Sequence, residues 1–431
     1  MTPLEAMRGA KAQSVRVDST ATDWLPGYLS FLLTALIPAL AKPEDPDAGS
    51  PLGQIVWSIA YLLAAYFLFK GGERAKTLLR QSPVIWAFVF LMLLSTAWSV
   101  EPDVTFKNAI ELAGTTVVSM YFVLRYPLQR LLECAGLAFG TIAILSLVVV
   151  VFFPQHGRTL WGAGPWQGIY PEKNNLGKAM AFGVISMTIA LFYGSRRRRF
   201  FAFGTLVLCL LMLLGSQSAT ALVASVAATA LGLFFLLSKS PKFAMLAWGI
   251  AGALVISAVI AFLVVGFQPD ASLLGRSSSL TGRTDFWPYL QQAISDRPIL
   301  GYGYNAFFRS SVGTDYLSYY VVEAGGWSPY HAHDSVLQIG LDAGFVGIAM
   351  MIVLLVVALV RAVRYVSPAR GVVSAWPLII VLYIIFGSYT ETYVGDYNSF
   401  EWIFLVAAML YPARSKASAA SAARPVPAMP R

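Results

Sequence analysis

The longest apolar run in this chain constrains its fold more than any other feature. Residues 200–237 are apolar almost throughout and are interrupted only by the polar tetrapeptide at residues 215–218. A helix that crosses the hydrocarbon core of a bilayer needs about 20 residues, so this run is nearly twice too long for one crossing. We therefore expect two antiparallel membrane helices that meet at the tetrapeptide.

The composition agrees with a protein that lies largely in lipid. Hydrophobic residues make up 57% of the chain and charged residues only 12%, whereas a soluble domain carries about 25% charged residues. Apolar stretches of suitable length recur near residues 24–40, 54–69, 83–98, 107–124, 131–153, 175–194, 200–216, 218–237, 243–266, 335–360, 372–388 and 400–412. The sequence thus predicts an all-α polytopic membrane protein with about twelve transmembrane helices, in a transmembrane domain covering residues 24–412, and it argues against a cytosolic enzyme.

Basic residues indicate which side of the membrane each loop faces. Four consecutive arginines at positions 196–199 follow the sixth apolar stretch, and the positive-inside rule places such a loop in the cytoplasm. Alternation from that loop puts most of the 31 lysines and arginines on the same side, together with residues 1–23 and a disordered tail at 413–431. Membrane topology therefore explains the net charge of +9, and we expect the lipid bilayer, not nucleic acid, as a partner.

The longest external loop, residues 267–333, holds much of the polar chemistry. Loops of this length in compact proteins are usually functional. We expect a short surface helix in it, capped by Thr284 or Asp285 with Pro288 in its first turn. The many aromatic residues of the loop fit either an interfacial belt or platforms that stack on sugar rings.

Several basic residues are expected outside, where positive charge is normally avoided. Arg283 is a candidate anion clamp because guanidinium binds phosphate in a bidentate manner, although a surface ion pair is the simpler alternative. For Arg297 the structural alternative is favoured. Lys173 and Asn174 stand at the start of the sixth predicted helix, where free backbone amides favour an anion. Lys178 lies four residues after Asn174 on the same helix face and fits either a substrate contact or a lysine that extends to the interface.

A histidine pair precedes the tenth predicted helix. The segment His331-Ala-His333-Asp334 leads into a polar stripe that continues through Gln338 and Asp342, one residue every four. A neutral imidazole here is suited to accept a proton from a sugar hydroxyl. A structural histidine and a metal ligand are the alternatives. We expect no metal, because other external histidines and carboxylates do not cluster in the sequence with ligand spacing.

The nature of any glycosyl donor follows from the side on which the polar residues lie. The chain has no GxxxxGK[ST] phosphate-binding loop, and its GYGYN segment lacks the strand and helix context of a dinucleotide site. Because the polar residues are predicted to face outward, where nucleotide sugars are absent, a donor there has to be carried by lipid.

Four segments together resemble the bacterial O-antigen ligase and polymerase superfamily, and most closely its ExoQ-type exopolysaccharide polymerases. These are GIYPEKNNLGKAM, the SQSATALV hairpin, LTGRTDFW followed by RPILGYGYNAFF, and HAHDSVLQIGLDAGFVG, within residues 168–347. Two departures stand out. Asp334 replaces the asparagine that usually follows the family's histidine, and Gln217-Ser218 stands where ligases commonly carry an arginine, which weakens the assignment as a ligase.

The resemblance implies a GT-C-like helical fold in the bacterial inner membrane with its active site facing the periplasm. It implies a metal-independent, inverting glycosyltransferase without cofactor, which uses an undecaprenyl-diphosphate-linked glycan donor and a glycan or lipid acceptor. His333 takes the family's histidine position and Arg283 its arginine, as catalytic residues. Substrate binding is expected at Lys173, Asn174, Lys178, Gln217, His331 and Asp334.

Polysaccharide chain-length and export proteins are candidate partners. A ligase acting on lipid A core, an O-oligosaccharyltransferase and a non-catalytic flippase or exporter are the rival functions.

Overall fold

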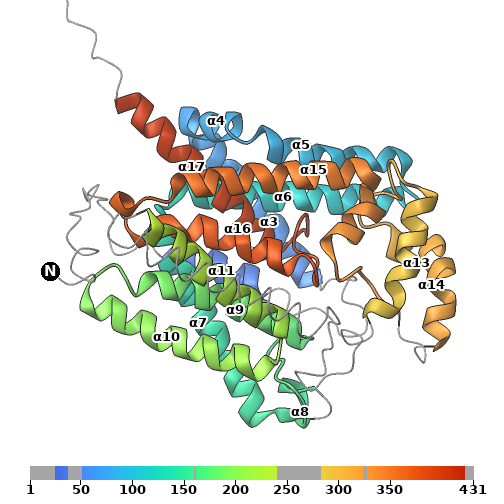
Figure 1. Cartoon of the computed structure of the whole chain (residues 1–431), viewed down its shortest axis with the longest axis horizontal. Helices are drawn as coiled ribbons and strands as arrows, with labels where there is room; N and C mark the ends of the chain where they lie inside the picture. The colour runs from blue at the N-terminus through green and yellow to red at the C-terminus, as the bar shows by residue number, and fades with distance from the viewer. Residues whose placement is uncertain (1–24, 37–50, 160–161, 240–282, 324–327, 423–431) are drawn as a thin grey trace, which may run out of the picture.

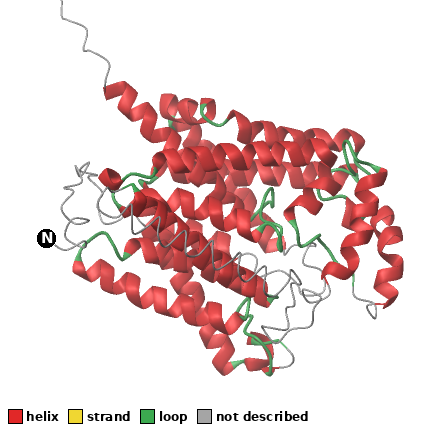
Figure 2. Ribbon diagram, viewed as in Figure 1, coloured by secondary structure: helices red, strands yellow, loops and turns green. Residues whose placement is uncertain are grey.

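The computed structural model describes residues 25–36, 51–159, 162–239, 283–323 and 328–422, and this part of the chain is a helical bundle (Figures 1 and 2). Its α-helices are α2 (Leu25–Leu36), α3 (Pro51–Lys70), α4 (Gly72–Arg80), α5 (Pro83–Leu94), α6 (Pro102–Arg125), α7 (Leu128–Phe152), α8 (Pro154–Gly157), α9 (Lys173–Ala190), α10 (Arg196–Ser216), α11 (Ala219–Ser238), α13 (Arg283–Asp296), α14 (Ser311–Glu323), α15 (Ser335–Tyr365), α16 (Trp376–Gly387) and α17 (Phe400–Ala422). Short 3-10 helices are η3 (Ser95–Trp98), η7 (Phe307–Arg309), η8 (Pro368–Arg370) and η9 (Val372–Ala375).

Every predicted span that falls on described residues coincides with a helix, which confirms an all-helical protein. The span near 243–266 and the loop residues 267–282 lie outside the described residues. Five of the described helices, α3, α7, α10, α11 and α15, are long and apolar enough to cross a membrane. A sixth crossing results if α4 and the α5–η3 segment, which meet at a 74° bend, are counted together. The total of twelve spans and the likeness to a GT-C fold stay predictions.

The predicted hairpin in the long apolar run is confirmed. Helix α10 ends at Ser216, and Gln217 adopts a left-handed backbone with φ of 50° before α11 begins. The helix expected in the long loop also exists as α13, but its start was predicted wrongly. It begins at Arg283, so neither Thr284 nor Asp285 precedes it as a cap, and Pro288 lies inside it. The predicted apolar side is confirmed, because Phe286 and Leu290 are buried within the bundle.

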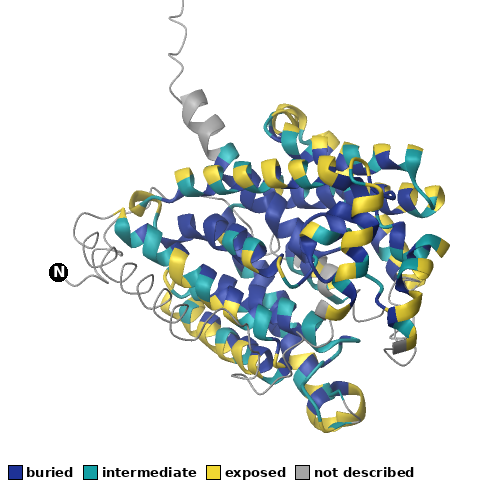
Figure 3. Ribbon diagram, turned by 45° about the vertical axis from the view of Figure 1, so that its right-hand side comes forward, coloured by how far each residue is buried: buried dark blue, intermediate teal, exposed yellow. Residues whose placement is uncertain are grey.

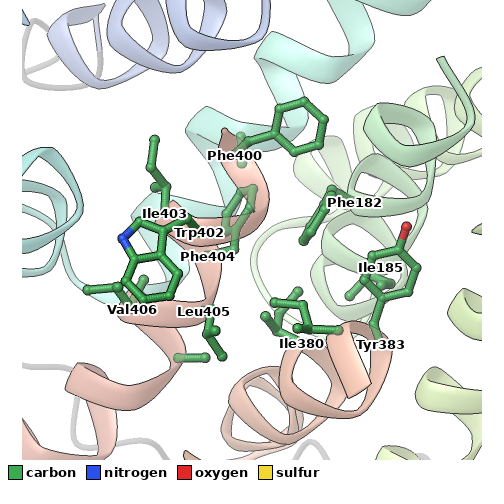
Figure 4. Close-up of a cluster of buried hydrophobic side chains, with 14 of the residues drawn as sticks. Phe182, Ile185, Ile380, Tyr383, Phe400, Trp402, Ile403, Phe404, Leu405 and Val406 are labelled. Carbon is green, nitrogen blue, oxygen red and sulfur yellow. The ribbon is translucent and has the colours of Figure 1, made fainter. Parts of the chain in front are cut away.

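The core of the bundle lies around α16 and α17. Phe404 of α17 stacks on Phe182 of α9 with ring centroids 4.9 Å apart (Figure 4). Trp376 of α16 contacts the Phe404 ring edge-on. Buried side chains fill the centre, whereas exposed residues line the outward faces of the peripheral helices (Figure 3). Many of those exposed residues are large and apolar, such as Phe200, which is 80% exposed. Such faces suit contact with lipid tails and would be unfavourable in water.

Helix α15 is broken by a kink that the GYGYN loop fills. Ala343 and Gly344 have non-helical backbone angles, which leaves nearby carbonyls without their usual partners within the helix. The amide of Tyr302 donates to the carbonyl of Leu341 at 2.7 Å, and Gly303 donates to Asp342 at 3.0 Å. In return, Phe345 donates to the carbonyl of Pro298 at 2.7 Å. The sequence motifs GYGYN and LDAGFVG are thus held together by backbone hydrogen bonds, and we call this contact the joint.

The two ends of the bundle differ in charge. Helix α15 runs from Asp334 and the histidine pair at one end to Arg361 and Arg364 at the other, and α9 runs from Lys173 toward the arginine-rich start of α10. In Figure 1, α13 and α14 mark the histidine end and α4 marks the arginine end. The segregation agrees with the side assignments predicted from charge.

The joint at the kink predicts a selective effect of glycine substitution. Gly344 has φ of 60° and ψ of −156°, a region that side chains disfavour, and a Cβ there would lie 2.4 Å from the carbonyl group of Ile299. Gly344→Ala should therefore destabilise the protein by about 1–3 kcal/mol or more. Gly204→Ala in α10 is the control, because a Cβ at that position meets no atom within 4 Å. Thermal unfolding of the detergent-purified protein should show a lower midpoint for Gly344→Ala alone. Equal midpoints for the two variants would show that stability does not depend on the close contact at Gly344.

Candidate functional site

The histidine pair lies in a tight turn immediately before α15. Asp334 is the N-cap of this helix, and its Oδ1 accepts a hydrogen bond from the amide of Leu337 at 2.8 Å. His333 adopts a left-handed backbone with φ of 50°, and its amide donates to Nδ1 of His331 at 3.0 Å. The two imidazole rings lie 3.8 Å apart, centroid to centroid. The predicted neighbours His331 and His333 are therefore packed together in a conformation that α15 fixes.

Asp334 was predicted to bind substrate, but in the structure its side chain caps α15. Burial raises the pKa of its carboxyl above the ordinary value, and hydrogen bonds from the backbone amides of Leu337 and Val336 oppose the rise. The following members of the polar stripe also hold loops. Gln338 Oε1 accepts from the amide of Ala332 at 3.0 Å, and Asp342 Oδ1 accepts from the amide of Asn305 at 2.9 Å. The stripe therefore fastens the histidine turn and the GYGYN loop to α15.

A glutamate from a distant loop completes the histidine cluster. Glu391 lies between α16 and α17, and its Oε2 is 3.7 Å from Nδ1 of His333. Ser335 fixes this approach, because its Oγ donates to the carbonyl of Glu391 at 3.1 Å and accepts from the amide of Tyr393 at 2.9 Å. The Glu391 side chain is only 5% exposed and that of His333 only 7%. A buried carboxylate thus faces the imidazole predicted to act as a base.

Lys178 of α9 faces two carboxylates inside the bundle. Its Nζ lies 4.0 Å from Glu391 Oε2 and 3.8 Å from Glu401 Oε1, and the lysine side chain is 12% exposed. The same ammonium lies 5.6 Å from the ring centroid of Tyr393. The sequence left two interpretations of Lys178. The interpretation in which its side chain extends to the membrane interface is therefore wrong. The ammonium is directed into the protein, toward the glutamate that faces His333.

The start of α9 lies beside the other predicted contacts. Lys173 is the first residue of the helix, Asn174 follows it, and both are partly exposed. Glu172 accepts a hydrogen bond from the hydroxyl of Tyr330 at 2.5 Å, which links this end of α9 to the histidine turn. A Cβ on Gly177 would lie 2.4 Å from the side chain of Ser218, so the hairpin that carries Gln217 packs against the first turns of α9. The structure therefore gathers Lys173, Asn174, Lys178 and Gln217 at one end of the bundle.

The N-terminal end of α13 also reaches this region. Trp287, one helical turn after Arg283, donates from its indole nitrogen to the carbonyl of Ala332 at 3.0 Å. Its ring also lies 6.3 Å from that of Tyr389, in the loop that carries Glu391. The helix that begins with Arg283 therefore contacts both the histidine turn and the loop that carries Glu391.

Two further polar residues, Arg297 and Glu111, lie away from the histidine cluster. The guanidinium of Arg297 lies over the ring of Tyr302, 4.8 Å from its centroid, which agrees with the structural role favoured from the sequence. Glu111 of α6 accepts a hydrogen bond from Nδ2 of Asn398 at 2.8 Å and thereby anchors the far end of the loop between α16 and α17. These two residues support the scaffold around the histidine cluster.

Comparison with known proteins agrees with this arrangement. Residues 204–352, from α10 through the kink of α15, match a family model described as O-Antigen ligase. The chain is also 25% identical over 281 residues to the exopolysaccharide production protein ExoQ of Rhizobium meliloti (strain 1021), an alignment that covers 64% of this chain and 63% of the relative. The resemblance to the O-antigen ligase and ExoQ-type family is confirmed. The chain is thus similar to an O-antigen ligase model and to an exopolysaccharide production protein, and its apolar helices agree with a multi-pass membrane protein.

Two residues of the site were missed by the sequence interpretation. Neither Glu391 nor Glu401 was a candidate, because neither stands in one of the resembling segments. Both lie beyond residue 352, where the match to the O-antigen ligase model ends. The acidic pattern TETYVGDYNSFE between two apolar helices was the available signal. A buried lysine at Lys178 requires such carboxylates, since an uncompensated buried charge is costly.

The cluster also raises the question of a metal. Donor atoms of His331, His333 and Glu391 all lie within 4.8 Å of one another, a set that can hold a cation such as zinc. We expected no metal because the sequence shows no further cluster of ligands, but Glu391, which is distant in the sequence, approaches the histidines in space. However, the ammonium of Lys178 lies 4.0 Å from the same Glu391 oxygen and would repel a divalent cation. The donor set therefore fits a metal poorly and fits proton transfer better.

The buried charges predict how Lys178 contributes to stability. Lys178→Met leaves two buried carboxylates without their cation and should lower the free energy of unfolding by about 3 kcal/mol. Adding Glu401→Gln to Lys178→Met should restore part of the loss, because one of the unpaired charges is removed. Lys173→Met, at the partly exposed start of α9, is the control and should change stability little. Thermal unfolding in detergent measures all three. A fully stable Lys178→Met would show that the ion pairs do not support the fold.

Proposed function

We propose that this protein is a membrane glycosyltransferase that polymerises lipid-linked oligosaccharide repeat units. The donor in this proposal is a glycan on undecaprenyl diphosphate, and transfer takes place at the external face of the inner membrane. The observation that carries the proposal is the pairing of His333 with the buried Glu391 next to Lys178, in a relative of O-antigen ligases and ExoQ.

The proposed reaction is a single displacement with inversion. An acceptor hydroxyl of the growing glycan attacks the anomeric carbon, the new C–O bond forms, and the bond from that carbon to the lipid diphosphate breaks. The hydroxyl proton passes to the imidazole of His333, and the bonding electrons leave with the diphosphate. A positioned base of this kind typically contributes about 10²–10⁴-fold to the rate.

Glu391 is suited to support His333 during this step. When the imidazole takes up the proton it becomes a cation, and a carboxylate oxygen 3.7 Å from Nδ1 stabilises that charge. With both carboxylates ionised, Lys178 balances only one of the two negative charges on Glu391 and Glu401. The remaining negative charge favours an imidazolium at His333.

The diphosphate requires a different set of contacts. Because Lys178 is already neutralised by two glutamates, we assign the leaving group to Arg283 together with Lys173 at the start of α9. Asn174 and the amides of the first turn of α9 add donors for phosphate oxygens. Gln217, on the adjacent hairpin, and His331 are assigned to the sugars.

Two rival functions keep the same chemistry and change only the acceptor. Lipid A core as acceptor gives an O-antigen ligase, and a protein hydroxyl gives an O-oligosaccharyltransferase. The absence of an arginine at Gln217-Ser218 favours the polymerase over the ligase. A flippase is less compatible with the buried charges of the described residues, because Lys178, Glu391 and Glu401 gather at one end of the bundle and do not form a path across it.

The proposed base gives the first functional prediction. Purified protein incubated with lipid-linked repeat units should form a ladder of products, and His333→Ala should lower its rate at least about 100-fold. His333→Asn should fail equally; it is the informative variant because asparagine tolerates the left-handed backbone at this position. His331→Ala should be milder. A full ladder from His333→Asn would exclude the imidazole as the base.

The same assay tests the metal alternative. If proton transfer is the role of the cluster, a chelator should leave the wild-type rate unchanged. Loss of the ladder on chelation and its return with added zinc would instead assign His331, His333 and Glu391 to a metal centre. That result would overturn the base mechanism while leaving glycan transfer intact.

The leaving-group contact gives the second functional prediction. Arg283→Lys keeps the positive charge but loses the planar fork that binds two phosphate oxygens, so most of the activity should disappear. Arg297→Lys is the matched control, because that guanidinium packs on Tyr302 at the far end of α13. Rates are compared at equal amounts of folded protein. Near-normal transfer by Arg283→Lys would show that this residue does not bind the diphosphate.

A further inference from the structure

A cavity at the arginine end of the bundle has no part in the proposed reaction. It has a volume of about 220 Å³ and lies among α15, η8, α17 and the turn after α4. Arg361, Arg364 and Arg370 line it, together with Gln81, Tyr365, Pro412 and Ala413. Helix α15 separates this cavity from the histidine cluster, because the arginines lie at its C-terminal end and Asp334 precedes its first residue.

Among the described residues, no acidic side chain balances the positive charge of the cavity. No acidic residue of the described chain lines it, and none forms a salt bridge with any of the three arginines. Positive-inside topology explains why arginines stand at this end, but it does not require three of them to converge on one cavity. Three arginines that line one cavity without a carboxylate are suited to a multivalent anion, and phosphate matches the planar fork of guanidinium.

Contacts with the protein hold two of the three arginines in place. The guanidinium of Arg370 lies over the ring of Tyr365, 4.9 Å from its centroid, and Nη1 donates to the carbonyl of Tyr365 at 2.8 Å. Nη1 of Arg361 contacts the carbonyl of Met409 at 3.5 Å.

A row of apolar side chains leads along α15 to the cavity. Ile352, Val356 and Val360 are 53%, 53% and 41% exposed, and each lies four residues after the previous one. Arg364 is the next position in the same series, so it shares their helix face. A phosphate held at Arg364 would therefore have its attached chain lying along an exposed apolar face. A lipid has this combination of groups, and free phosphate does not.

We propose that this cavity binds the phosphate of an anionic phospholipid, such as phosphatidylglycerol, from the leaflet at the arginine end. The phosphate pairs with Arg361, Arg364 and Arg370, and the acyl chains lie along the apolar row of α15. Basic pockets between membrane helices recognise anionic headgroups by this chemistry.

Native mass spectrometry of the full chain in detergent tests the proposal, with phosphatidylglycerol, phosphatidylcholine or inorganic phosphate added separately. We expect a phosphatidylglycerol adduct, and we expect its fraction to fall roughly tenfold in Arg364→Gln/Arg370→Gln. The control Arg74→Gln/Arg196→Gln removes two exposed arginines outside the cavity and should keep the adduct. Arg364→Gln alone, at an exposed position, provides a second test if the double variant folds poorly.

Three results would overturn the proposal. Equal loss of the adduct in the control pair would show binding to general surface charge. An unchanged adduct in Arg364→Gln and in the double variant would remove the cavity from recognition. Displacement of phosphatidylglycerol by millimolar inorganic phosphate, or an equal adduct with phosphatidylcholine, would show that the site does not select an anionic lipid.

Discussion

A buried lysine between two glutamates is the interaction on which the site depends. Lys178 draws Glu391 and Glu401 toward α9, and Glu391 in turn meets His333. Charges at such depth persist only when they are paired, so the packing of α9, α17 and the loop between α16 and α17 has to keep these groups together. The cost of separating them fixes the loop, and the fixed loop presents a carboxylate to the imidazole. Stability and proposed catalysis therefore rest on the same contacts.

Helix α15 holds in place the segments that surround the site. Its N-cap holds the histidine turn, its glutamine and aspartate bind two loops, and its kink exchanges backbone hydrogen bonds with residues 298–303. An unbroken helix would satisfy its own backbone groups and leave that loop without partners. The kink thus makes a long apolar helix an anchor for the GYGYN loop, which explains why two distant glycine-containing motifs occur in the same chain.

The sequence predicted most of the helices but only part of the site. Apolar stretches and turn residues depend on local spacing, so the hairpin at Gln217 and the helix after Asp334 could be placed without tertiary contacts. Resemblance supplied His333 and Arg283 because both stand in recognisable motifs. Glu391 and Glu401 could not be found in this way, since their role arises from proximity to Lys178, more than 200 residues earlier in the chain. The start of α13 was missed for a related reason, because Pro288 is normally a signal for a first turn.

The reaction proposed for this site needs few catalytic groups, which agrees with the few charged side chains that the site contains. In the proposed reaction the lipid diphosphate is already a good leaving group, so the protein has to orient two glycans and remove one proton. Orientation alone is worth about 7–11 kcal/mol of the barrier in favourable cases. A single imidazole with a carboxylate behind it supplies the remaining proton transfer, and Lys178 keeps that carboxylate from leaving the bundle. A metal would add charge stabilisation that the leaving group does not need, at a position where an ammonium 4.0 Å from Glu391 opposes it.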